Sequence, residues 1–168
     1  LLAPHGVHVV IVGFVGRVQG LIVPRGNPQG IVALTDLVRE DISFVNRQEG
    51  AGTRVLLDYH LAEAGIDPTG ICGYGNEATT HLAVAAAIAH GDANCGLGIQ
   101  AAAQTMGLDF VPLFAERYDL VIPVENYESA LMAPLLALLR RPEARLRQRI
   151  AALGGYDTTP MGKVLAEV

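Results

Sequence analysis

The sequence contains no tryptophan, and aromatic residues make up only 5% of its 168 positions. Charged residues are also scarce at 17%, whereas 51% of the residues are hydrophobic. A chain this apolar has ample material for a core, so its composition argues against disorder. The apolar residues are mainly Ala, Val, Leu and Ile, which suits buried parallel strands covered by alanine-rich helices.

A concentrated positive charge is lacking as well. The chain has 12 basic and 17 acidic residues, for a net charge of −5, and its arginines form no long stripe. This distribution argues against direct binding of nucleic acid by this segment, because such binding depends on phosphate contacts. The densest basic run, residues 140–149, also contains Glu143 and is interpreted as a solvated helix face.

Long hydrophobic runs are absent too. No apolar run reaches the length of about 18 residues that a membrane-spanning helix needs, so no membrane partner is predicted. The start, residues 1–6, lacks the basic segment and apolar stretch of a signal peptide and has no initiator methionine, which is typical of a fragment. We therefore expect a cytoplasmic location.

Motifs for metal, cofactor or catalysis are not found. The two cysteines, Cys72 and Cys95, lie far apart without a CxxC pair, and we expect both to be buried free thiols. There is no GxSxG serine, no HExxH histidine pair, no P-loop and no dinucleotide fingerprint. No cofactor is predicted, and the enzyme interpretation is weakened without being excluded.

Strand and helix patterns alternate along the chain, which predicts an α/β fold with a largely parallel sheet. The expected strands are residues 7–15, 20–24, 42–46, 71–74, 95–99, 108–113 and 118–123. The expected helices are a short one at 30–37, then 53–64, 80–90, 100–106 and a long one at 129–153.

The most informative segment is residues 44–54, in which a strand leads through a glycine-containing loop into a helix. Gly50 and Gly52 would let the backbone approach a ligand, and Thr53 would cap the helix. The free N–H groups and the helix dipole would then form an anion seat, to which Arg54 or Arg47 adds a charge-assisted contact. An ordinary capped turn with a surface arginine explains the same residues about equally well.

A second candidate begins the alanine-rich helix. Thr79 or Thr80 can cap this helix, and His81 falls in its first turn, where the helix dipole disfavours the protonated ring. For either residue alone, a capping or structural role is the favoured interpretation. Two helix N-termini at the carboxyl ends of strands are a more specific pattern, because ligands of α/β sheets bind there.

Five segments together resemble the PBP-like substrate-binding domain, of the periplasmic-binding-protein type 2 class, and are similar to the molybdate-binding proteins of transport systems. These segments are residues 44–54, 80–87, 96–99, 116–123 and 154–157. The resemblance implies two α/β lobes joined by two crossover strands, with residues 1–44 and 118–168 in a first lobe and 45–117 in an inserted second lobe. It also implies an N-terminal βαβ unit, which the chain begins too late to contain.

The resemblance further implies that Gly50–Arg54 and Thr80–His81 form the second lobe's share of a ligand pocket, with Tyr118 at the return hinge. The expected function is non-catalytic binding or sensing of a small oxyanion, with molybdate or tungstate favoured and the lobes closing around it. A domain of an enzyme of molybdenum-cofactor biosynthesis and a degenerate dimerisation domain remain alternatives. Such domains also occur behind DNA-binding modules, so this fusion and a homodimer are left open.

Overall fold

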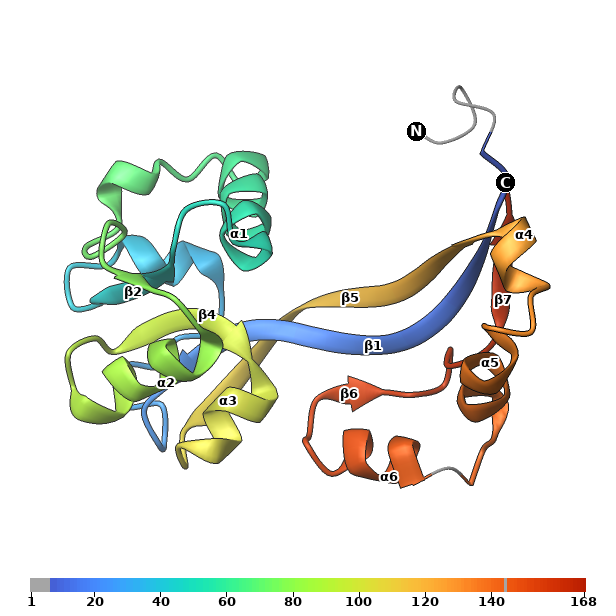
Figure 1. Ribbon diagram of the computed structural model, residues 1–168. Helices are drawn as coiled ribbons and strands as arrows, with labels where there is room; N and C mark the ends of the chain where they lie inside the picture. The colour runs from blue at the N-terminus through green and yellow to red at the C-terminus, as the bar shows by residue number, and fades with distance from the viewer. Residues whose placement is uncertain (1–6, 144) are drawn as a thin grey trace. The chain divides into compact units, whose positions relative to one another are not determined.

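The computed structural model describes residues 7–143 and 145–168 (Figure 1). The first six residues, on which the expectation about a signal peptide rests, lie outside this part of the chain. Backbone contacts divide the molecule into two compact units. The central unit is Val18–Phe114, and the terminal unit combines the described residues up to Arg17 with Ala115–Val168.

Two long strands pass from one unit to the other, as the predicted fold requires. They are β1 (Val9–Val23) and β5 (Asp109–Pro123), and they are neighbours in the sheet. The first boundary differs from the expected one, since it lies between residues 17 and 18 rather than between 44 and 45. The reason is that residues before 45 pack in one core with Leu57 and Leu61: Leu21, Val23, Ile31, Leu37, Ile42 and Phe44.

The central unit contains a mixed sheet, in which the strands follow the order β3-β2-β4-β1-β5. Strand β2 (Phe44–Arg47) is parallel to both β3 (Glu77–Ala78) and β4 (Cys95–Ile99). Strand β4 then pairs antiparallel with β1. The expected parallel pairing is therefore found only among β3, β2 and β4, at one end of the sheet.

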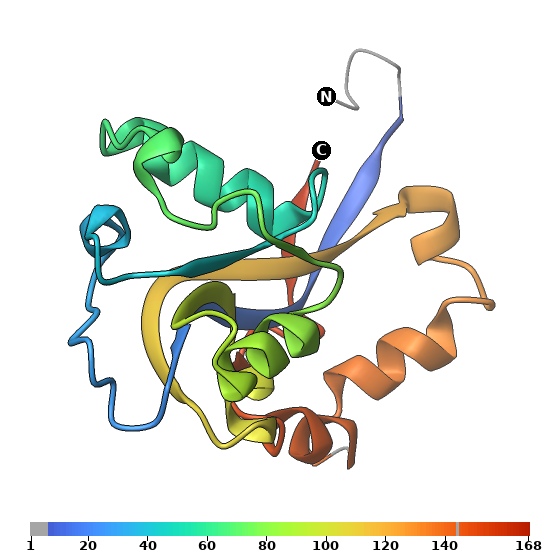
Figure 2. The same cartoon turned by 90° about the vertical axis from the view of Figure 1, so that its left-hand side faces the viewer.

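Helices cover both faces of this sheet because successive strand residues point to opposite sides. Helix α1 (Gly52–Glu63) packs on the face of Leu21 and Phe44. Helices α2 (His81–His90) and α3 (Gln100–Thr105) pack on the other, with Ile22 and Val45. The teal α1 and the lime-green α2 accordingly lie on opposite sides of the strands (Figure 1 and Figure 2). Two 3-10 helices, η2 (Leu34–Val38) and η3 (Pro68–Gly70), complete the unit.

The terminal unit is built on the outer parts of β1 and β5. Strands β6 (Tyr156–Asp157) and β7 (Val164–Glu167) both pair antiparallel with β1. Its helices are α4 (Val124–Tyr127), α5 (Ala133–Arg140) and α6 (Arg145–Ala151). Its buried core residues are Val10, Val12, Val15, Ile122, Leu136, Leu139 and Met161.

Each long strand replaces two expected shorter ones. Gly16 and Gly20 suggested a break in the first of them, yet neither has a positive φ. Gly20 is required for close packing instead, since a Cβ there would lie 2.1 Å from the carbonyl oxygen of Val111. A glycine that makes room for a neighbouring strand is thus indistinguishable in sequence from one that ends a strand.

Two further expectations are wrong. Residues 71–74 form turns rather than a strand, with Gly73 at φ 84°. The long helix expected over 129–153 is divided into α5 and α6, because the residue before Pro142 is held in an extended conformation. Residue 144, also within that expected helix, lies outside the described residues. In the described part of the chain, no helix is both long and apolar enough to cross a membrane.

Candidate functional site

The three parallel strands of the central unit end at one edge of the sheet, and a helix follows each of them. Strand β2 leads into α1, β3 into α2, and β4 directly into α3. Because carboxyl ends of parallel strands share an edge, the first N–H groups of these helices gather there. We call residues 48–54 and 79–83 the strand-end edge.

Helix α1 begins at Gly52, one residue earlier than the sequence suggested. Its N-cap is Ala51, with no side-chain cap, so the predicted capping role of Thr53 is wrong. Thr53 is the second helical residue and is buried, with 4% of its surface exposed. The first helical hydrogen bond runs from Val55 N–H to Ala51 C=O at 3.0 Å. The N–H groups of residues 52–54 therefore have no acceptor within the helix.

Both glycines before and at this helix start border open space. Gly50 has a φ of 80°, the left-handed conformation that glycine adopts most readily. A Cβ added to Gly50 or to Gly52 would meet no atom within 4 Å. Another molecule can therefore approach the backbone at Gly52.

Helix α2 begins as predicted. Its N-cap is Thr80, whose Oγ1 accepts a hydrogen bond from Ala83 N–H at 3.0 Å. His81 is the first helical residue and is half-buried. A Cβ added to Gly98 would lie 3.7 Å from His81 Nδ1, which places the imidazole against β4.

Arg47 joins the two helix starts. It is the last residue of β2, and its guanidinium donates to the carbonyl oxygens of Ala78 at 3.2 Å and Thr79 at 2.9 Å. Those two carbonyls directly precede the N-cap of α2. The backbone N–H of Gln48 also donates to Ala78 C=O, at 3.2 Å. The loops before α1 and α2 therefore lie side by side.

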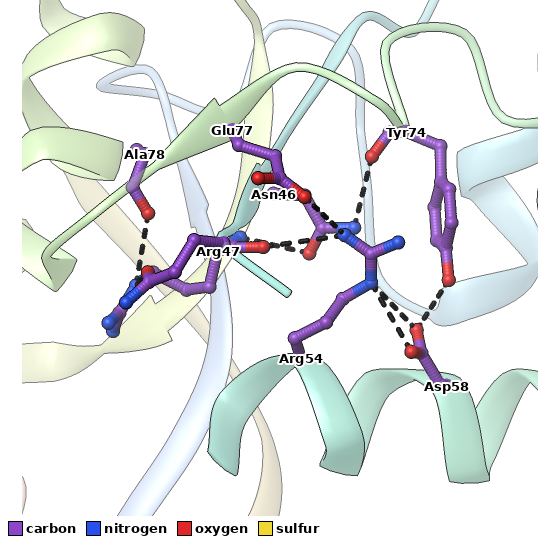
Figure 3. A network of polar contacts seen from close by, with 8 residues as sticks. Asn46, Arg47, Arg54, Asp58, Tyr74, Glu77 and Ala78 are labelled. Carbon is purple, nitrogen blue, oxygen red and sulfur yellow. Dashed lines mark hydrogen bonds and ion pairs between the residues drawn. The ribbon is translucent and has the colours of Figure 1, made fainter. Parts of the chain in front are cut away.

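Arg54 is the centre of a second network (Figure 3). Its Nε lies 3.1 Å from an Asp58 oxygen, and its Nη1 lies 3.4 Å from Glu77 Oε1 and 3.4 Å from Arg47 C=O. Its guanidinium also lies 4.2 Å from the ring centroid of Tyr74, whose hydroxyl donates to Asp58. Burial lowers the pKa of Arg54, but Tyr74 and Asp58 outweigh burial and raise the pKa above its ordinary value. The arginine thus joins α1, β2, β3 and the loop that carries Tyr74.

The other predicted site residue, Tyr118, belongs to the terminal unit. The Arg17 guanidinium lies 4.7 Å from the centroid of its ring, and Arg17 pairs with Glu116. The structure thus brings six of the seven predicted residues together within the central unit: Gly50, Gly52, Thr53, Arg54, Thr80 and His81.

The cysteines are not part of this site. Both are free; Cys95 is buried as expected, whereas Cys72 is exposed, contrary to expectation. Burial raises the pKa of the Cys95 thiol, which disfavours the thiolate. Among the residues that the structure describes, no group of three or more His, Cys, Asp or Glu could hold a metal ion.

Sequence reasoning missed Asn46, Asp58 and Tyr74, which support the strand-end edge without belonging to it. Asn46 is 1% exposed, and its side chain donates to Tyr74 C=O at 3.2 Å and accepts from Arg47 N–H at 2.9 Å. A signal existed for two of them: Asn46 is a polar residue in an apolar strand, and Asp58 lies four residues after Arg54. For Tyr74 we find no such signal.

The fold agrees with what comparison with known proteins shows. A family model described as the PBP superfamily domain matches residues 3–140, and the chain belongs to this family. The chain is 38% identical over 157 residues to the uncharacterized protein YvgK of Bacillus subtilis (strain 168), covering 94% of this chain and 50% of that protein. It thus spans half the length of that relative.

A second relative is shorter. It is an uncharacterized protein of Clostridium pasteurianum, encoded in the 5' region of a 2Fe-2S ferredoxin gene. It is 36% identical over 115 residues, which cover 68% of this chain and 100% of that protein.

Solved structures show the same fold at low sequence identity. A two-component system protein that mediates signal transduction has a TM-score of 0.64 at 15% identity, over 88% of this chain and 55% of its own. L-Phospholactate-bound PEB3 has a TM-score of 0.59 at 15% identity, and the match covers 87% of this chain and 67% of PEB3. The periplasmic aliphatic sulphonate binding protein SsuA of Escherichia coli has a TM-score of 0.51 at 21% identity, and the match covers 81% of this chain and 48% of SsuA. The chain therefore has a periplasmic-binding-protein fold.

Proposed function

We propose that this chain is a binding domain for a small oxyanion, which it holds at the strand-end edge of the central unit. One observation carries the proposal. Helices α1 and α2 begin at neighbouring strand ends, and the first backbone N–H groups of each helix have no backbone acceptor within that helix. Such groups, at the positive end of a helix dipole, favour a bound anion. The open space at Gly52 supports the proposal, because it lets a ligand reach the backbone.

The preferred ligands in this proposal are molybdate and tungstate, held mainly by neutral N–H and O–H donors. The charge of Arg54 is already compensated by Asp58 and Glu77, so backbone amides supply the field that attracts the anion. Phospholactate and aliphatic sulphonates, named for PEB3 and SsuA, also carry oxyanion groups. Phosphate and sulfate are therefore the natural competitors in a test.

The proposed role is sensing without catalysis. In this proposal, ligand binding shifts the equilibrium between positions of the two units, which β1 and β5 connect. The fold relative that mediates signal transduction is in keeping with such a role. We further propose that the domain acts in the cytoplasm. Ligand binding there would change the state of a fused DNA-binding module or of a second copy of the chain.

The test is isothermal titration of the purified full-length protein with molybdate, tungstate, sulfate and phosphate. We expect saturable binding of molybdate or tungstate with a micromolar or lower Kd. Gly52→Ala should weaken it severalfold, because the added methyl group fills the open space before α1. Gly75→Ala is the matched control, since Gly75 also borders open space but lies outside the strand-end edge. Absence of heat with all four anions would overturn the oxyanion proposal.

A further inference from the structure

Strand β1 changes its pairing partner where it passes between the units. It pairs with β6 at Gly16 and Arg17, and with β4 from Gln19 to Ile22. Val18 lies between the residues that pair with β6 and those that pair with β4. The boundary between the two units falls directly before it. The return crossing, on β5, lies between residues 114 and 115. Among the described strands, β1 and β5 alone continue through the boundary, as a two-stranded ribbon, and such ribbons twist more than wider sheets.

A cluster of three side chains joins the two strands beside this point. Arg17 on β1 forms an ion pair with Glu116 on β5, and its guanidinium lies 4.7 Å from the centroid of the Tyr118 ring. The side chains of Arg17 and Glu116 are only 13% and 25% exposed. A shielded ion pair with a stacked ring is stronger than a pair in open solvent. We call these three residues the brace.

On the central side of the boundary, the same two strands are held by backbone packing. A Cβ added to Gly20 would lie 2.1 Å from the Val111 carbonyl oxygen and 2.9 Å from the Cα of Pro112. Gln19, next to Gly20, is 1% exposed. The ribbon is therefore fixed on both sides of the boundary, by close packing on one side and by side chains on the other.

We propose that the brace of Arg17, Glu116 and Tyr118 keeps β1 and β5 in register on the terminal side, so that bending between the units is confined to Val18 and residues 114–115. Arg17 is then a positioning residue that acts through the stiffness of the ribbon. The inference requires the two units and their two connections, and it does not depend on which ligand binds.

The test measures the distance between the units in protein without ligand. Spin labels are placed on the exposed Cys72 of the central unit and on Lys163→Cys of the terminal unit, whose native side chain is also exposed. Double electron–electron resonance gives the distance distribution. We expect it to broaden in Arg17→Met and in Glu116→Gln. The matched control is Arg117→Met, because Arg117 also pairs with a carboxylate on β5 but is 54% exposed and outside the brace.

A conservative variant separates charge from stacking. Arg17→Lys keeps the charge and loses the planar guanidinium, so we expect an intermediate width. If Arg17→Met does not fold, the width of the distance distribution in Glu116→Gln decides the test. Equal widths in wild type and the folded brace variants would overturn the proposal, as would equal broadening in Arg117→Met. Because no anion is present, this result and the anion titration succeed or fail independently.

Discussion

At the scale of single residues, Thr80 gives the most direct test of the strand-end edge. Its hydroxyl accepts the N–H of Ala83, so Thr80→Ala should lower the free energy of unfolding by about 1 kcal/mol. Thr80→Ser retains the hydroxyl and should remain close to wild type in urea denaturation. An equal loss in both variants would contradict the capping role.

Arg54 is the second residue with a clear expected effect. Arg54→Met leaves Asp58 and Glu77 without their common cation, and we expect a loss of about 1 kcal/mol, since both carboxylates are partly exposed. The control is Arg39→Met, which removes a more exposed pair with Asp41 and should change little. Urea denaturation of both variants checks this, and equal losses would show that the network adds nothing.

The sequence predicted the role of a residue well when its partners are close in the sequence, and poorly when they are far away. Thr80 and Gly91 act within their own helix, as N-cap and as a left-handed C-cap with φ 83°, so the sequence predicted both ends of α2 closely. The partners of Arg54 include Glu77, which is 23 residues away in the sequence. No local pattern indicates a contact of that range, so the candidate site was predicted without its supporting network.

At the scale of elements, the Arg147 side chain fixes α6 by hydrogen bonds, in addition to the packing of Leu146 and Ile150 against the core. The Arg147 guanidinium donates to the carbonyl oxygens of Leu139 at 2.7 Å, Arg141 at 3.1 Å, Thr158 at 2.5 Å and Met161 at 2.7 Å. The interpretation of the basic run 140–149 as a solvated face is thus wrong for this arginine, which is half-buried.

Replacing this side chain should loosen the terminal unit. Arg147→Met removes four hydrogen bonds to carbonyl oxygens, of which that of Thr158 keeps another donor, Met161 N–H, and a loss of about 2 kcal/mol is expected from charged hydrogen bonds of this kind. Hydrogen exchange should accelerate at the end of α5 and around residues 158–161. Arg149→Met alters an exposed arginine of the same helix and should have no such effect. Unchanged exchange in Arg147→Met would rule out this role.

Helices were also predicted better than strands as whole elements. Helix α2 carries local signals at both ends. That β1 is one continuous strand, in contrast, depends on neighbours far away in the sequence, such as Val111 beside Gly20. Strand β3 has only two residues, and it exists because β2 offers a free edge beside it. Such pairings are set by tertiary structure and leave no periodic pattern.

At the scale of the whole molecule, the oxyanion proposal predicts that a ligand stabilises one unit more than the other. At a ligand concentration 100 times Kd, the stabilisation is about 2.7 kcal/mol. Hydrogen exchange with molybdate should slow most at residues 50–54 and 80–83, and least in α6. Sodium chloride at equal ionic strength serves as the control. Uniform slowing in both units would argue against binding at the strand-end edge.

The division of the chain into units also sets an order of assembly during synthesis. The central unit is one continuous segment, Val18–Phe114, so all of its contacts become available once residue 114 has left the ribosome and before Ala115–Val168 follow. The terminal unit must wait, because Val10 of β1 pairs with Glu167 of β7. The outer part of β1 therefore lacks its β7 partner until residues 164–167 have been made, while an already folded central unit holds the inner part of the same strand in place.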